Sequence, residues 1–137
     1  MNNEKRILIL DDEGSIRELL KEVLEEAGYT VLSSSAPGIT AIKAYKADVI
    51  LLDLHMANSN EKQGLDVLTH LWEDQDLTIP IIIYSAYAGF EDTTDEIREI
   101  EELYGNGRKV YASINKGLGL APLLDALEKL FGTVKLP

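Results

Sequence analysis

The feature that most constrains this chain is an alternation of short apolar runs with longer segments of helical period. Three of the runs are continuously apolar and rich in β-branched residues, as expected of strands covered on both faces of a sheet. They lie at residues 7–10, 49–53 and 81–85. A weaker run lies at residues 30–33, and a looser, more polar one at residues 109–115. The sequence therefore predicts five strands.

Between these runs, apolar residues recur at steps of three and four, which is typical of a helix with one buried face. The clearest such helix is expected to be capped by Ser15 and to stop at Gly28, a suitable first residue beyond a helix. Further helices are expected over residues 37–45, 64–72, 92–104 and 121–131. Strands and helices that alternate in this way predict an α/β fold, a doubly wound parallel sheet with right-handed crossovers and helices on both faces.

Composition favours a single domain over residues 1–137. That length, with 45% of residues hydrophobic, is enough to bury one core, and no linker or repeat divides the chain. The formal net charge of −11 opposes direct binding to nucleic acid. No cysteine is present, and no apolar stretch approaches the length of a membrane span, so we expect no disulfide, no membrane insertion and a cytoplasmic location.

Polar residues close the predicted strands. Asp11 and Asp12 follow the first strand, Asp53 closes the third, Ser85 closes the fourth and Lys116 follows the last. In parallel sheets of this kind ligands bind at the carboxyl ends of the strands, so these side chains are expected to converge. Neighbouring carboxylates repel one another unless a cation neutralises them, and oxygen ligands alone suit a hard ion such as Mg²⁺. The pattern predicts a magnesium site built from the three aspartates.

The same residues suit phosphoryl chemistry. The carboxylate of Asp53 can attack a phosphoryl group and form an acyl phosphate once a metal shields the incoming negative charge. Lys116 can pair with Asp53 and then with a phosphoryl oxygen, and the hydroxyl of Ser85 can donate to another. Taken singly, acids at the start of a helix, a surface lysine and a small serine all have ordinary structural explanations. Only their combination favours a shared site.

The segments ILILDDE, VILLDLHM, IIIYSAY and INKG carry these residues in order along the chain. Together they resemble the receiver domains of two-component response regulators, over about residues 7–130. The resemblance implies a flavodoxin-like fold with strand order 2-1-3-4-5. It also implies that Asp12 and Asp53 bind Mg²⁺ directly, that Asp11 binds it through water, and that the backbone carbonyl of His55 completes the protein ligands.

The resemblance further implies that Asp53 is phosphorylated and that Ser85 and Lys116 bind the phosphoryl group. The donor would be a phosphohistidine on a sensor histidine kinase or a histidine phosphotransfer protein. Such a domain catalyses its own phosphotransfer and dephosphorylation without being a conventional turnover enzyme. Its output would be an altered surface for an unidentified downstream protein, and it would be a monomer or a weak dimer.

The sequence departs from the family pattern at several places. Gly64 lies eleven positions beyond Asp53, which predicts a longer loop at the rim of the site. Gly117 stands where a proline commonly follows the lysine, so Lys116 is expected to be less preorganised. Ser113 stands where an aromatic switch residue is common, with Tyr111 earlier on the same expected strand face. The helix after the fourth strand is expected to be long and acidic.

Two other functions remain open on the sequence. One is an interaction module that keeps the fold and works without phosphorylation, which Gly117, Ser113 and the long acidic helix would suit. The other is a Mg²⁺-dependent phosphohydrolase. An enzyme of that kind would ordinarily carry a second acid two residues after the nucleophile, where this chain has His55.

Overall fold

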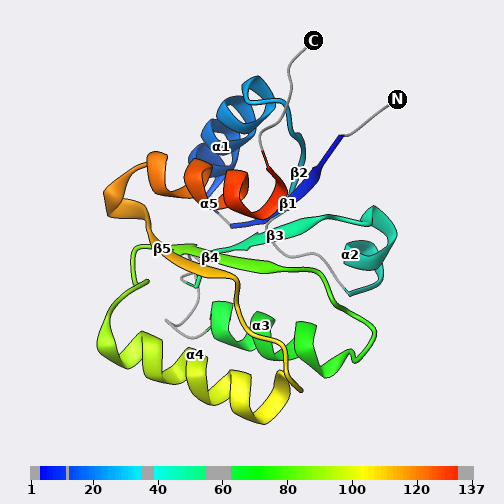
Figure 1. The fold of residues 1–137 in the computed structure, drawn as a ribbon, viewed down its shortest axis with the longest axis vertical. Helices are drawn as coiled ribbons and strands as arrows, with labels where there is room; N and C mark the ends of the chain where they lie inside the picture. The colour runs from blue at the N-terminus through cyan, green and yellow to red at the C-terminus, as the bar shows by residue number, and fades with distance from the viewer. Residues whose placement is uncertain (1–3, 12, 35–38, 55–62, 133–137) are drawn as a thin grey trace.

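The computed structural model describes residues 4–11, 13–34, 39–54 and 63–132. Five strands alternate with five helices, and a short 3₁₀ helix, η1, follows the last strand (Figure 1). The strands are β1 (Arg6–Leu10), β2 (Thr30–Ser34), β3 (Val49–Leu52), β4 (Ile81–Ser85) and β5 (Ala112–Asn115). The helices are α1 (Gly14–Glu26), α2 (Ile39–Tyr45), α3 (Gln63–Glu73), α4 (Glu91–Tyr104), η1 (Lys116–Leu118) and α5 (Ala121–Phe131).

The strands form one sheet in the order β2-β1-β3-β4-β5, and every neighbouring pair is parallel. The predicted α/β fold and strand order are therefore confirmed. In the register, Leu10 at the end of β1 lies opposite Ser34 of β2 and Leu52 of β3. The carboxyl ends of these strands thus meet at one edge of the sheet, which is where the sequence placed the polar residues.

Two hydrophobic clusters cover the two faces of the sheet. Alternate residues of β1 show the division, because Leu8 and Leu10 belong to one cluster, whereas Ile7 and Ile9 belong to the other. Helices α1 and α5 cover one face, and α2, α3 and α4 cover the other (Figure 1). Every residue of β3 and β4 is buried, as their uninterrupted apolar sequences predicted. Among the described residues, no helix has the length and apolar character needed to span a membrane.

Helix α1 begins earlier than Ser15, so the expectation that Ser15 caps it is wrong. The N-cap residue is Glu13, and Ser15 lies in the first turn, with its hydroxyl 3.4 Å from a carboxylate oxygen of Glu13. The cause lies upstream, because the carboxylate of Asp11 accepts the backbone N–H of Glu13 and turns the chain directly after β1. At the other end Gly28 follows the C-cap residue with φ of 101°, as its glycine predicted.

The fifth strand is shorter than predicted, since it begins at Ala112 instead of residue 109. Before it, the backbone N–H of Val110 donates to the carboxylate of Glu101 on α4 instead of to β4. Tyr111 makes one backbone bond to β4, to the carbonyl of Ile81, and lies directly before the first strand residue. Tyr111 therefore precedes β5, and the expectation that it lies on that strand is wrong. Its side chain is 43% exposed.

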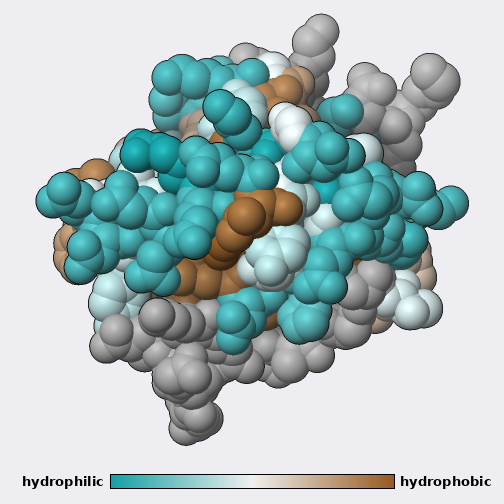
Figure 2. Space-filling model, turned by 90° about the horizontal axis from the view of Figure 1, so that it is seen from below, coloured by the Kyte–Doolittle hydropathy of each residue, from teal (hydrophilic) through white to brown (hydrophobic). Residues whose placement is uncertain are grey.

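Helix α4 is long and acidic, as predicted. Its sequence EDTTDEIREIEELY contains seven acids and one arginine, and only Ile97 is fully buried. Figure 2 looks onto the side of the molecule that carries α3 and α4, and it shows a strip of apolar atoms within a mostly hydrophilic surface. Most acidic residues of α4 thus form a solvated face, while Ile97 and Ile100 pack into the hydrophobic cluster that also contains residues of α3. Leu103, near the end of the helix, is exposed.

Arg108 joins the ends of α3 and α4. Its guanidinium group donates hydrogen bonds to backbone carbonyls at 2.5 to 2.9 Å. These carbonyls belong to Trp72 at the end of α3, to Asp74 and Leu77 in the loop before β4, and to Gly105 beyond α4. The carbonyls at helix ends have no partner within the helix, so one side chain here satisfies several of them at once.

Replacing Arg108 by methionine should destabilise the fold strongly. The variant loses charge-assisted hydrogen bonds and leaves partly buried carbonyls without partners, which should lower the free energy of unfolding by about 2–4 kcal/mol. Urea denaturation followed by circular dichroism measures this change. Arg98→Met is the matched control, because Arg98 is 63% exposed and only approaches Asp95 at 3.5 Å. Equal stability of the two variants would contradict the structural role given to Arg108.

Candidate active site

Two acidic residues lie side by side at the carboxyl edge of the sheet. Asp11 follows β1 and Asp53 follows β3, and the backbone N–H of Asp53 donates to the carbonyl of Leu10 at 3.0 Å. Both carboxylates are buried, with only 2% of Asp11 and 6% of Asp53 exposed. Two like charges removed from water require a compensating cation nearby.

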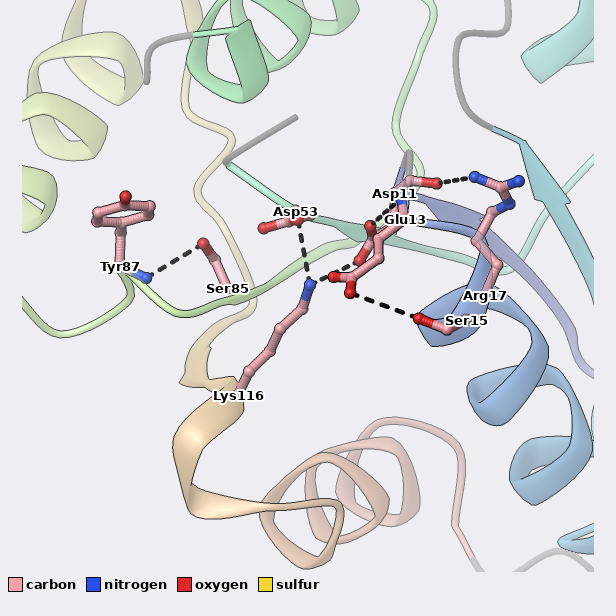
Figure 3. A network of polar contacts seen from close by, with 8 residues as sticks. All are labelled: Asp11, Glu13, Ser15, Arg17, Asp53, Ser85, Tyr87 and Lys116. Carbon is pink, nitrogen blue, oxygen red and sulfur yellow. Dashed lines mark hydrogen bonds and ion pairs between the residues drawn. The ribbon is translucent and has the colours of Figure 1, made fainter. Parts of the chain in front are cut away.

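Lys116 supplies that cation. Its ammonium nitrogen lies 2.7 Å from Oδ2 of Asp11 and 3.1 Å from Oδ2 of Asp53, between the two carboxylates (Figure 3). The three residues come from the ends of β1, β3 and β5 and are separated by up to 105 positions in the sequence. The side chain of Lys116 is only 17% exposed. The predicted convergence of Asp11, Asp53 and Lys116 is therefore present in the fold.

The surroundings of Lys116 shift its pKa in two opposing directions. Burial by itself lowers the pKa, because it disfavours the charged form. The hydrogen bond to Asp11, together with the charges of Asp53 and Asp11, outweighs burial and raises the pKa of Lys116 above its ordinary value. The ammonium group is accordingly held in its charged form at neutral pH, where it offsets one of the two negative charges of the carboxylates.

Asp11 is fixed by two contacts, with Glu13 and Arg17, that were not predicted from the sequence. The backbone N–H of Glu13 donates to Oδ1 of Asp11 at 2.9 Å, and the guanidinium of Arg17 donates to the backbone carbonyl of Asp11 at 2.7 Å. Oδ2 of Asp11 is left for Lys116. The spacing of Asp11 and Glu13 is a local signal for such a turn. Arg17 looks like any polar residue of an amphipathic helix, so no sequence pattern indicated its contact.

Ser85 ends β4, the strand that lies between β3 and β5. It is completely buried, and its hydroxyl oxygen accepts the backbone N–H of Tyr87 at 3.2 Å (Figure 3). A hydroxyl that accepts one hydrogen bond can still donate its own proton. The stem of Lys116 must pass the end of β4 to reach Asp53, so a small residue at this position leaves room for it. Ser85 therefore lies at the predicted edge of the sheet.

Two predicted metal ligands, the side chain of Asp12 and the backbone carbonyl of His55, lie outside the described residues. Within the described part of the chain, no group of three or more His, Cys, Asp or Glu side chains is arranged to hold a metal ion. The buried carboxylates of Asp11 and Asp53 are oxygen donors of the kind that suits Mg²⁺. The donor set that is described thus fits a hard cation, although by itself it is incomplete.

Gly117 and Ser113 are the two departures from the family pattern that lie near Lys116. Gly117 occupies the second position of η1, and its backbone N–H donates to the side-chain oxygen of Asn115 at 2.7 Å. Proline has no N–H and could not make this bond. Ser113, at the position expected for an aromatic switch, is exposed on β5 opposite Ile83. Asn115 was not singled out from the sequence, since an asparagine before a lysine has no distinctive pattern.

Comparison with known protein families and curated relatives places this arrangement among signalling proteins. Residues 7–101 match the family described as the response regulator receiver domain. Over 96% of this chain, the sequence is 27% identical to the chemotaxis protein CheY-3 of Vibrio cholerae, covering 95% of that protein. It is 32% identical to the DNA-binding response regulator MtrA of Mycobacterium tuberculosis, over 71% of this chain but only 40% of MtrA.

Solved structures of response regulators are also similar to this chain. The response regulator TrrA of Thermotoga maritima, crystallised in complex with Mg²⁺-BeF, is 28% identical, with a TM-score of 0.66, and the match covers 92% of this chain and 98% of TrrA. The BeF₃-activated receiver domain of RstA from Klebsiella pneumoniae has a TM-score of 0.73 at 17% identity, over 93% of this chain and 98% of that one. The second match supports the fold alone.

Lys116 should make the stability of the protein depend on pH in the alkaline range. Because its pKa is higher in the folded than in the unfolded chain, its contribution is complete below the unfolded value of roughly 10.4 and is lost as the pH rises through the folded value. Lys116→Met should therefore be less stable by about 3 kcal/mol at pH 7 without metal. The difference from the wild type should shrink above about pH 10.

Urea denaturation at a series of pH values measures both effects. Lys129→Met serves as the control, because Lys129 is 72% exposed and pairs with Asp125 on the surface of α5. Its stability should follow that of the wild type. A stability difference for Lys116→Met that stays constant through the alkaline range would contradict the role of its charge.

Proposed function

The chain belongs to the response regulator receiver domain family and is a receiver domain of two-component signalling, and from that premise we propose that Asp53 accepts a phosphoryl group. The donor is a phosphohistidine on a sensor histidine kinase or a histidine phosphotransfer protein. The observation that carries the proposal is the ammonium of Lys116 held between the buried carboxylates of Asp11 and Asp53. This arrangement provides a nucleophile with a fixed positive charge beside it.

In the proposed reaction a carboxylate oxygen of Asp53 attacks the phosphorus in line with the imidazole nitrogen of the donor. The new O–P bond forms as the P–N bond breaks, and the leaving imidazole takes up a proton. Lys116 offers its charge to the phosphoryl oxygens while they approach Asp53, and the hydroxyl of Ser85 donates to one of them. The protein contributes chiefly position and charge, as expected for phosphoryl transfer.

Magnesium is the proposed cofactor. We assign its ligands to Asp53 and Asp12 directly, to Asp11 through water and to the backbone carbonyl of His55. Bound Mg²⁺ would supply positive charge that stabilises the phosphoryl oxygens. Support comes from the buried carboxylates of Asp11 and Asp53 and from the complex of the similar protein TrrA with Mg²⁺-BeF.

The output is a changed protein-binding surface. A phosphorylated side chain gains a charge of about −1.5 to −2, which draws Ser85 and Lys116 toward Asp53. That movement biases an existing equilibrium between two arrangements of α4 and the loop before it. The target is a downstream protein, because the net charge of −11 opposes direct contact with nucleic acid.

Acetyl phosphate with Mg²⁺ should phosphorylate the wild type at Asp53. Intact-protein mass spectrometry should show the gain of one phosphoryl group, and EDTA should prevent it. Asp53→Asn should abolish the gain, because an amide cannot form the acyl phosphate. Asp48→Asn is the control, since Asp48 flanks the opposite end of β3 and accepts the backbone N–H of Arg6. It should be phosphorylated like the wild type.

Other outcomes of this experiment would favour one of the two alternative functions. No mass gain, together with no spectral response to beryllofluoride and Mg²⁺, would reject phosphorylation and favour an interaction module that works without it. Sustained turnover of a generic phosphate ester that is lost in Asp53→Asn would instead indicate a phosphohydrolase.

A further inference from the structure

The side chain of Asn115 uses both of its N–H donors and its carbonyl oxygen at the edge of the sheet. Its Nδ2 donates to the backbone carbonyls of Ala86 and Ala88, both at 3.0 Å. Its Oδ1 accepts the backbone N–H of Gly117 at 2.7 Å. A primary amide has two N–H groups and one carbonyl, so each of them has a partner of the right kind. Turning the amide around would place donor against donor and acceptor against acceptor.

These bonds connect the two turns that carry Ser85 and Lys116. Asn115 lies opposite Ser85 in the pairing of β4 with β5. Its donors hold the turn that follows Ser85, and its acceptor holds the first turn of η1, which begins at Lys116. One amide therefore fixes the distance between the backbones that present the hydroxyl and the ammonium.

The position of the Asn115 amide disfavours a side chain at position 117, directly after the lysine. A Cβ atom on Gly117 would lie 2.9 Å from Oδ1 of Asn115, which is closer than real Cβ contacts allow. Proline at this position would also remove the N–H that Asn115 accepts. Asn115 and Gly117 thus depend on each other. Aspartate at position 115 would lose both donors and set a negative charge against two carbonyl oxygens.

We infer that Asn115 is a positioning residue for phosphoryl transfer, which sets Ser85 and Lys116 in the relative position that the transferring group requires. The inference rests on the proposed function, because Asn115 acts only through two residues that bind the phosphoryl group. In this chain the amide of Asn115, together with Gly117, holds Lys116 in place, a role that a proline after the lysine would otherwise have.

Kinetics of phosphorylation by acetyl phosphate test the inference. Asn115→Ala should lower the maximal rate on the order of tenfold, because the misplaced groups act in the transition state. The Mg²⁺ affinity should change less than the rate, since the substitution removes neither of the carboxylates of Asp11 and Asp53. Gln75→Ala is the matched control. It removes an exposed amide contact, with Asn106 at 2.9 Å, at the opposite end of β4, and its rate should match the wild type.

A double-mutant cycle tests whether Asn115 and Gly117 affect the rate of phosphorylation together or independently. Gly117→Ala should slow the reaction by forcing its Cβ against Oδ1 of Asn115. In the Asn115→Ala background that oxygen is gone, so the second substitution should add little. Strong non-additivity supports the inference, and additive effects overturn it.

Amide NMR of the unphosphorylated protein gives a readout that does not need phosphorylation. Asn115→Ala should shift the backbone signals of residues 86–88 and Gly117 and leave those of β2, at the opposite edge of the sheet, in place. A wild type that takes up no phosphoryl group would reject the proposed function, whatever these signals show. A phosphorylated wild type with an unchanged Asn115→Ala rate, or a variant whose signals shift throughout the chain, would overturn the inference alone.

Discussion

The rest of the site depends on one ammonium group placed between two buried carboxylates. Asp11 and Asp53 are adjacent because β1 and β3 are neighbouring parallel strands, and their burial would be costly without a cation. Lys116 comes from β5, two strands beyond β3, so its long stem must cross the end of β4. Neighbouring strands are about 4.8 Å apart, so Lys116 reaches across roughly two such spacings, past the end of the strand that Ser85 closes. The ion pairs of Lys116 with Asp11 and Asp53 thus depend on the order of the strands in the sheet.

Periodicity made much of the fold predictable. The central strands are covered on both faces, so their uninterrupted apolar sequences identified them, and the helices followed from their apolar spacing. The polar residues Asp11, Asp53, Ser85 and Lys116 were predictable because each stands at the carboxyl end of a predicted strand, where ligands bind in sheets of this kind. Parallel strands then bring such residues to one edge.

The contacts that the sequence did not reveal involve backbone groups. Arg17 donates to the carbonyl of Asp11, Arg108 donates to carbonyls at the ends of two helices, and Asn115 joins two turns through their peptide groups. Every residue carries such a carbonyl, so these partnerships leave no pattern in the sequence. The predicted starts of α1 and β5 were wrong for the same reason. Asp11 and Glu101 bind backbone N–H groups near these starts, and such bonds leave no pattern in the sequence.

The bonds of Arg108 lie at the end of α4 that is farthest from the carboxylates, and this has a mechanical consequence for that helix. The last turn of α4 is tied through Arg108 to α3 and to the loop before β4, and Glu101 ties it to the chain entering β5. Its first turn follows directly on the residues that Asn115 and Ser85 hold. Because the last turn is held in this way, a displacement that began beside Ser85 would move the first turns of α4 more than its last turn.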